Sequence, residues 1–273
     1  MLSEKQQLRM LELPDVAELL KVYMTEHWLC GSAQLKLLEL PNNKELVRLY
    51  QSSWSLNDEV LLKLLEHADN EELIKRYISS WSCGLKFQLK LFELPNAEEW
   101  IKLYISKWQL HYMVEPKLFE LPDASEMIKG YISKYHCEGG CELKLFELPN
   151  AEELVKLHIS KWKLCPSAEL KLFELPNAAE LVKIYVSKNG LYDESELKML
   201  DLPNVAELLK IYVATRSLCP EAQSKLFDLP DAAELVKIYI SKRKLNKSLV
   251  QKVLELPNVT ELMQIYVFRY ITG

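Results

Sequence analysis

Residues 172–181 read Leu-Phe-Glu-Leu-Pro-Asn-Ala-Ala-Glu-Leu, and close variants of this stretch return every 27 residues along the chain. Proline holds the fifth place nine times, and Ala68 takes the remaining position. A fixed period of this length is typical of proteins in which one supersecondary unit stacks on the next. We number the sequence repeats from one to ten. Their prolines are Pro14, Pro41, Pro95, Pro122, Pro149, Pro176, Pro203, Pro230 and Pro257.

The residue after the proline position is always Asn or Asp, and Glu always follows three places later. Asn and Asp are preferred helix N-caps, and a Glu three residues on completes a capping box by reaching back to the cap amide. A helix, here called helix B, is therefore predicted to begin in every repeat. The predicted caps are Asp15, Asn42, Asp69, Asn96, Asp123, Asn150, Asn177, Asn204, Asp231 and Asn258.

The residues after each cap show the period of an amphipathic helix. In repeat 7, Leu181, Val182 and Tyr185 fall on one face at 100° per residue, while Glu180 and Lys183 lie opposite. We expect a helix of roughly fourteen residues. Small residues recur near its end, Ser in most repeats, and predict a close approach by the following repeat.

A shorter helix, helix A, is predicted before each proline. Pro166 stands where a first helical residue is expected, and Ser3, Asn57 and Asn246 are plausible caps in other repeats. In repeat 7, Ala168, Leu172 and Leu175 form one apolar side, with Leu170 and Phe173 on the other. Helix A therefore has two sides to bury, as an element between two neighbours requires.

A leucine-rich repeat is the competing interpretation, because Leu170-x-Leu172 looks strand-like and 27 residues lies within that family's range. That pattern needs Asn or Cys at position 175, where this chain has Leu. Helix A also consists of strong helix formers. We therefore predict an all-α fold that forms one domain over residues 1–273. The domain is predicted to be an α-solenoid superhelix of ten 27-residue two-helix repeats, either right-handed or of undetermined hand.

The chain resembles the α-solenoid class to which tetratricopeptide, pentatricopeptide and HEAT repeats belong. The resemblance is architectural and covers all 273 residues. The period is shorter than in those families and their signature residues are absent, so no specific family and no functional residue is implied.

Composition narrows the function classes. The net charge is −5 and acidic and basic residues are mixed throughout, with no basic arm or acidic tail. The first 25 residues lack the apolar stretch of a signal peptide, and no segment is apolar enough to span a membrane. The six cysteines are scattered and do not form the dense disulfide framework of a small secreted domain. We expect a cytoplasmic protein that does not act on membranes and has no further domain.

One basic residue in each of the first nine repeats forms a lysine ladder in helix B, which Gln264 breaks in repeat 10. Such a ladder suits a phosphate backbone, but each cation follows a Glu by three residues and is also an ordinary intrahelical ion-pair partner. The acidic net charge disfavours nucleic acid. The ladder comprises Lys21, Arg48, Lys75, Lys102, Lys129, Lys156, Lys183, Lys210 and Lys237.

One aromatic residue near the end of helix B recurs in repeats 2 to 6: Trp54, Trp81, Trp108, Tyr135 and Trp162. Asn189, Arg216 and Arg243 replace it before Tyr270. Packing between repeats is one explanation. The other is a partner-binding surface, because a structural role common to all repeats is not expected to stop at repeat 6.

Two places depart from the repeat. His111, Tyr112 and His136 in the irregular middle join the candidate partner-binding residues, and His136 with Cys137 and Cys141 is weighed as part of a metal site. Drift within the array is the alternative, and no metal or cofactor is predicted. At the end, Phe268, Tyr270 and Ile271 make an apolar surface: a closing cap, a self-association site or the edge of a longer array.

No catalytic motif stands out, since the repeated carboxylates are explained as caps. The sequence favours a non-enzymatic scaffold that binds a protein or peptide on one face of the superhelix. The alternatives are a nucleic-acid-binding array that uses the lysine and aromatic ladders, and a self-assembling structural protein.

Overall fold

The computed structural model describes residues 1–138 and 140–271, with all their side chains except that of Ala68. Every regular element in these ranges is a helix, and they contain no strand. The all-α class is therefore confirmed, and the leucine-rich alternative, which requires strands, is wrong. None of the described helices combines the length and hydropathy needed to cross a bilayer.

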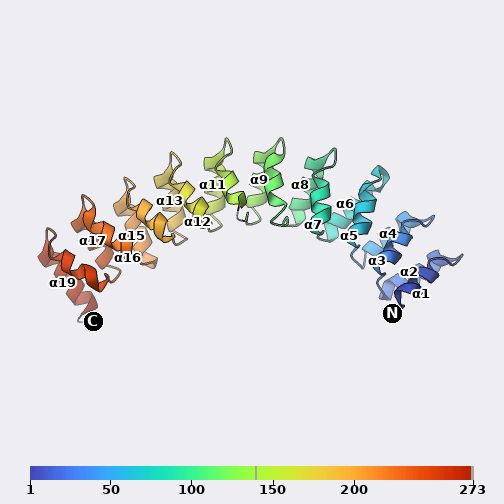
Figure 1. The fold of residues 1–273 in the computed structure, drawn as a ribbon, viewed down its shortest axis with the longest axis horizontal. Helices are drawn as coiled ribbons and strands as arrows, with labels where there is room; N and C mark the ends of the chain where they lie inside the picture. Colours follow the sequence, from blue (N-terminus) through green and yellow to red (C-terminus); the bar gives the residue numbers. More distant parts are fainter. Residues whose placement is uncertain (139, 272–273) are drawn as a thin grey trace. The chain divides into compact units, whose positions relative to one another are not determined.

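The helices form two compact units, Met1–Met127 and Ile128–Gly273. In the first unit each helix packs on the helix two places along the chain, so short helices pack on short ones and long helices on long ones (Figure 1). Its elements are α1 (Glu4–Met10), α2 (Val16–Glu26), α3 (Gly31–Leu37), α4 (Asn43–Gln51), α5 (Asp58–Leu65), η1 (Ala68–Asn70), α6 (Glu71–Ser80), α7 (Leu85–Leu91), α8 (Ala97–Lys107), η2 (Glu115–Glu120) and the start of α9 (Ala124–Ile132).

The second unit follows the same packing rule, with α11 on α13, α13 on α15 and α15 on α17 (Figure 1). Its elements after α9 are α10 (Gly140–Leu145), α11 (Ala151–Ile159), α12 (Pro166–Leu172), α13 (Ala178–Val186), α14 (Asp193–Met199), α15 (Val205–Thr215), α16 (Pro220–Lys225), η3 (Leu226–Asp228), α17 (Ala232–Ile240), η4 (Lys247–Leu249), α18 (Val250–Val253) and α19 (Val259–Tyr270).

The recurrent Pro-Asn stretch is a turn rather than a capping box. Ala178 N donates to the carbonyl of Leu175 at 3.0 Å across Pro176 and Asn177. Asn177 has φ −100° and ψ 30°, close to the third residue of a type I turn, in which proline favours the second place. The helix starts directly after Asn177, as predicted.

The predicted capping hydrogen bond is wrong in helices α2, α4, α8, α11, α13, α15, α17 and α19, whose cap side chains accept no backbone N–H. In α4, α8, α11, α13, α15 and α17 a backbone hydrogen bond closes the turn without the cap side chain, whereas Asn258 before α19 has a left-handed backbone with φ 61°. In repeat 3, where Ala68 replaces proline, the short segment η1 intervenes and the cap moves from Asp69 to Asn70. Side-chain caps are confirmed at the short helices, where Ser3, Asn57 and Asn246 accept backbone N–H groups.

The long helices are shorter than the expected fourteen residues. Helix α13 has nine residues and ends before Ser187, whose hydroxyl donates to the carbonyl of Ile184 at 2.7 Å. Asn189 N then donates to the carbonyl of Tyr185 at 2.8 Å. The recurrent serine thus binds a carbonyl of the last turn, and because Ser187 is exposed, the expected close approach of the next repeat at this residue is wrong.

The core lies between the short and long helices. Of the two apolar sides predicted for helix A, Ala168 and Leu172 are fully buried, while Leu170 and Phe173 are half-buried. One tyrosine from each of seven long helices is also fully buried, with its hydroxyl inside the protein. These are Tyr50, Tyr77, Tyr104, Tyr131, Tyr185, Tyr212 and Tyr239.

Candidate functional site

A buried glutamine in the short helix connects one sequence repeat with the next. Gln34 Nε2 donates to the carbonyl of Leu29 at 2.8 Å and to Tyr50 Oη at 3.1 Å. Gln34 Oε1 accepts from Asn57 N, at the cap of α5, at 2.7 Å. One side chain therefore satisfies polar groups of its own repeat and of the following one, as buried polar groups require.

Gln88 makes the same three hydrogen bonds in α7. Its Nε2 donates to Cys83 O at 2.7 Å and to Tyr104 Oη at 3.1 Å, and its Oε1 accepts from His111 N at 2.8 Å. His111, predicted as a partner-binding residue, is thus half-buried and held by its backbone in this network.

A glutamate takes the glutamine's place in α12 and α14 of the second unit, whereas Gln223 keeps it in α16. Glu169, fully buried in α12, accepts from Tyr185 Oη at 2.9 Å and from Tyr192 N at 2.7 Å. Glu196 accepts from Tyr212 Oη and Cys219 N, both at 2.6 Å. Burial raises the pKa of Glu169 above its ordinary value, since the charged form loses its hydration.

Sequence reasoning missed this network because it treated the short helix as wholly apolar between its exposed charges. The signal was available: when the repeats are aligned, one position of the short helix holds Gln or Glu in eight of ten. The aligned residues are Gln7, Gln34, Leu61, Gln88, Glu115, Glu142, Glu169, Glu196, Gln223 and Val250.

Repeat 6 departs from the network because His158 replaces the buried tyrosine. His158 Nε2 lies 3.4 Å from Glu142 Oε1, and His136 Nε2 lies 3.2 Å from the same oxygen. The two imidazole rings stack with their centroids 5.5 Å apart. Glu142 Oε2 accepts from Cys165 N at 2.7 Å, the same bond to the next repeat that Glu169 and Glu196 make.

The surroundings of this cluster differ on its two sides. His158 and Glu142 are buried, whereas the His136 side chain is 36 % exposed. Burial favours a higher pKa for Glu142, but the hydrogen bonds from His158 and Cys165 outweigh it and the pKa is lowered. His136 thus lies with Glu142 and His158, while Cys137 and Cys141, its predicted companions, are buried in the core.

The aromatic ladder holds neighbouring long helices together through its ring nitrogens. The indole Nε1 of Trp54 donates to Met24 O at 2.7 Å, and that of Trp108 donates to Ile78 O at 2.6 Å. The last carbonyls of a helix have no partner within it, so these bonds satisfy the end of the preceding long helix. Trp81 and Trp162 make the equivalent bonds, at 3.1 Å and 3.3 Å.

The role reappears after repeat 6, in repeats 9 and 10, contrary to the sequence argument, whereas Arg216 of repeat 8 bonds a different carbonyl, that of Lys188. Arg243 Nε donates to Val213 O and Tyr270 Oη to Ile240 O, both at 2.9 Å and both thirty residues back, as in the tryptophans. A guanidinium or a phenol replaces the indole because each offers a donor at the same reach. The tryptophan, Arg243 and Tyr270 side chains named here are half-buried, as is Tyr135, whose ring contacts that of Tyr131.

One part of the aromatic surface remains open in the first unit. Trp28, in the loop after α2, is 46 % exposed. Together with Trp54, Leu29 and Leu56 it lines a hollow of about 300 Å³ at the ends of the long helices. Sequence reasoning overlooked Trp28 because it lies one place past the aromatic position of the ladder.

A second exposed aromatic group lies on the loop after α8. Tyr112 and Met113 are both largely exposed, and the ring of Tyr112 packs against His111 with centroids 4.5 Å apart. The loop is stiffened by a hydrogen bond from Met113 N to His111 Nδ1 at 3.3 Å. His111 and Tyr112, both predicted as candidates, therefore lie together on this loop. In the second unit, the ring centroids of His136 and Trp162 lie 5.6 Å apart.

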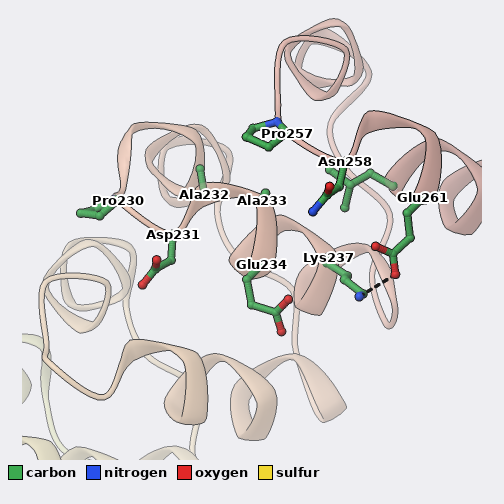
Figure 2. Close-up of a pocket in the computed structure, with 10 residues that line it drawn as sticks. Pro230, Asp231, Ala232, Ala233, Glu234, Lys237, Pro257, Asn258 and Glu261 are labelled. Atoms are coloured by element: carbon green, nitrogen blue, oxygen red, sulfur yellow. Dashed lines mark ion pairs between the residues drawn. The ribbon is translucent and has the colours of Figure 1, made fainter.

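Part of the lysine ladder forms ion pairs between adjacent long helices, while Lys75 and Lys102 pair within their own helices with Glu71 and Glu98, as the intrahelical alternative predicted. Lys183 Nζ lies 2.7 Å from Glu207 and Lys237 Nζ 2.6 Å from Glu261, in each case the recurrent Glu of the next repeat. Figure 2 shows the second pair across a polar hollow between two turns, those of Pro230 and Pro257. The recurrent Glu, predicted to close a capping box, is therefore a partner of the preceding repeat's lysine in these pairs.

The C-terminal helix α19 leaves apolar residues uncovered on its own unit. Phe268 is 80 % exposed and Ile271 is largely exposed, as is Leu254 directly after α18. Tyr270, the third predicted self-association residue, is half-buried and uses its hydroxyl on Ile240. Two of the three predicted residues therefore form the open apolar surface.

Comparison with protein-family models, curated proteins and solved structures finds no match to this chain.

Proposed function

We propose that this chain is a non-enzymatic scaffold that binds a protein or peptide segment. The proposed binding surface lies within residues 1–127 and is formed by the loops that follow the long helices. We further propose that its helices form an α-solenoid of ten two-helix repeats working in the cytoplasm. The solenoid is supported by hydrogen bonds that recur at a spacing of 27 residues, such as those that Gln7 and Gln34 accept from Cys30 N and Asn57 N.

The observation that carries the proposal is the hollow beside Trp28. Large exposed aromatics that line a hollow are typical of the anchor points of protein interfaces, because they bury much area at little cost in conformational entropy. Trp54 supports one wall and is itself fixed by its bond to Met24 O. A partner with a protruding side chain that packs on the exposed Trp28 ring is the ligand that this lining fits, and Ser55 and Asn57 add polar groups to the hollow.

The ion pairs weigh against the nucleic-acid alternative. A phosphate backbone would have to compete with Glu207 and Glu261 for the lysines of the preceding repeats, in a chain whose net charge is −5.

The proposal predicts that binding depends on Trp28. Peptides selected from a random phage-displayed library on the wild-type protein should lose at least about tenfold in affinity when Trp28 is changed to Ala, because truncation of a buried aromatic anchor costs about 2 kcal/mol or more. Isothermal titration calorimetry with the synthetic peptides measures the change.

Val22→Ala is the matched control. Val22 is an exposed apolar residue on α2 that does not line the hollow, so its loss should leave the affinity unchanged. Equal effects of both substitutions, or selected peptides indifferent to Trp28→Ala, would contradict the proposed site.

A second candidate function, self-assembly, is favoured by the exposure of Phe268 and Ile271. If this surface mediates association, the wild-type protein will show a concentration-dependent mass in multi-angle light scattering, and Phe268→Ser with Ile271→Ser will give a monomer. The physical reason is that burial of such side chains supplies about 25 cal/mol per Å². A wild-type protein that is monomeric at every concentration removes this candidate.

A further inference from the structure

We propose that His136, Glu142 and His158 form a binding site for a divalent transition-metal ion, with Zn²⁺ as the expected occupant. The three side chains come from the loop after α9, from α10 and from α11, and their ligand-type atoms all lie within 4.8 Å of one another. Imidazole and carboxylate are ligands that Zn²⁺ accepts readily.

The separations between these atoms suit a shared ion. Ligand atoms held about 2.0–2.1 Å from a tetrahedral zinc lie about 3.3–3.4 Å from each other. The two imidazole nitrogens lie 3.2 Å and 3.4 Å from Glu142 Oε1. An ion between them therefore needs little movement of the buried groups.

The carboxylate is already oriented for this role. Glu142 Oε2 is held by Cys165 N at 2.7 Å, so Oε1 remains directed at the two histidines. Hydrogen bonds to the non-coordinating atoms of a ligand side chain fix the orientation of that side chain and raise the affinity of the site for the metal. The exposed face of His136 offers an entry path, and three protein ligands leave a fourth position for water.

The site exists because two residues, His136 and His158, differ from their counterparts in the neighbouring repeats. Repeats 7 and 8 keep the buried carboxylate but pair it with Tyr185 or Tyr212, which donates a single hydrogen bond. Lys163 and Gly190 stand where repeat 5 has His136. The neighbouring repeats thus hold the same carboxylate without the two imidazoles.

The test is a titration of the full, metal-free chain with ZnCl2 and CoCl2. We expect one ion per chain by calorimetry, a Co²⁺ visible spectrum without the near-ultraviolet band of thiolate ligation, and a Zn²⁺-dependent rise in melting temperature. His158→Tyr restores the residue of the other repeats and so preserves the fold. It should weaken Zn²⁺ binding at least about tenfold and abolish the thermal shift.

Tyr185→His is the matched control, because it places an imidazole beside Glu169 without a second one. It should not add a bound ion. The proposal is overturned if His158→Tyr binds Zn²⁺ as the wild type does, if the Co²⁺ spectrum shows thiolate ligation, or if the wild type binds no ion, in which case the cluster is only a His–Glu–His hydrogen-bond network.

Discussion

Replacing Trp108 with Ala is expected to lower the free energy of unfolding by about 3 kcal/mol, as measured by urea denaturation followed by circular dichroism. The substitution removes a half-buried ring and leaves Ile78 O without its donor. Truncation of a fully buried tryptophan costs about 3–5 kcal/mol, so a half-buried ring with a lost hydrogen bond falls near the lower end.

Two further variants separate the ring from its nitrogen. Trp108→Phe keeps most of the apolar contact and should cost about 1–2 kcal/mol, the penalty for an unsatisfied carbonyl. Trp28→Ala, at an exposed tryptophan, should cost less than about 1 kcal/mol. Equal losses for Trp108→Ala and Trp28→Ala would show that the indole hydrogen bond does not support the neighbouring helix.

Replacing Glu169 with Leu is the second large expected loss, also about 3 kcal/mol. Tyr185 Oη and Tyr192 N would both lose their buried acceptor, and an unsatisfied buried donor costs about 1–3 kcal/mol. Leu itself fits a short helix at this position, since Leu61 occupies it in repeat 3. The loss therefore reports on the hydrogen bonds rather than on packing.

Glu169→Gln is the informative partner of that variant. The amide can reproduce the bonds of Gln88, and it removes a buried charge. Since the pKa of Glu169 is raised in the folded state, the wild type loses stability as the pH rises from the ordinary glutamate value of 4.5 through the raised value.

The gain in stability from Glu169→Gln should consequently be larger at about pH 8 than at about pH 4. Unfolding free energies of both proteins at the two pH values measure it. A difference that stays constant between them would mean that the carboxyl group does not titrate with a raised pKa.

Much of the local structure could be predicted from sequence because it depends on neighbours along the chain. The Pro-Asn pair placed the start of the long helices, since a turn closes over four consecutive residues such as 175–178. The helical class followed from the period and from the helix formers around Glu169. The mechanism at Asn177 was still wrong, because its backbone made the turn without help from the side chain.

The residue contacts between repeats were decided by tertiary structure. From the sequence, Glu207 was expected to interact within its own helix, but it forms an ion pair with Lys183 of the preceding long helix. Trp108 reaches a carbonyl thirty residues earlier, and the change of residue type to Arg243 hid the return of that role in repeat 9. Sequence spacing cannot show which donor reaches which acceptor across two packed helices.

The sequence by itself determined the period, the turns, the helical class and the places where the pattern breaks, because these depend on local backbone preference and on hydrophobic spacing. Only the tertiary structure decided that Glu142 is buried and that His136 and His158 meet at one of its oxygens. Those residues are 6, 16 and 22 positions apart in the chain. Packing of three separate segments, rather than any local preference, brings their side chains together.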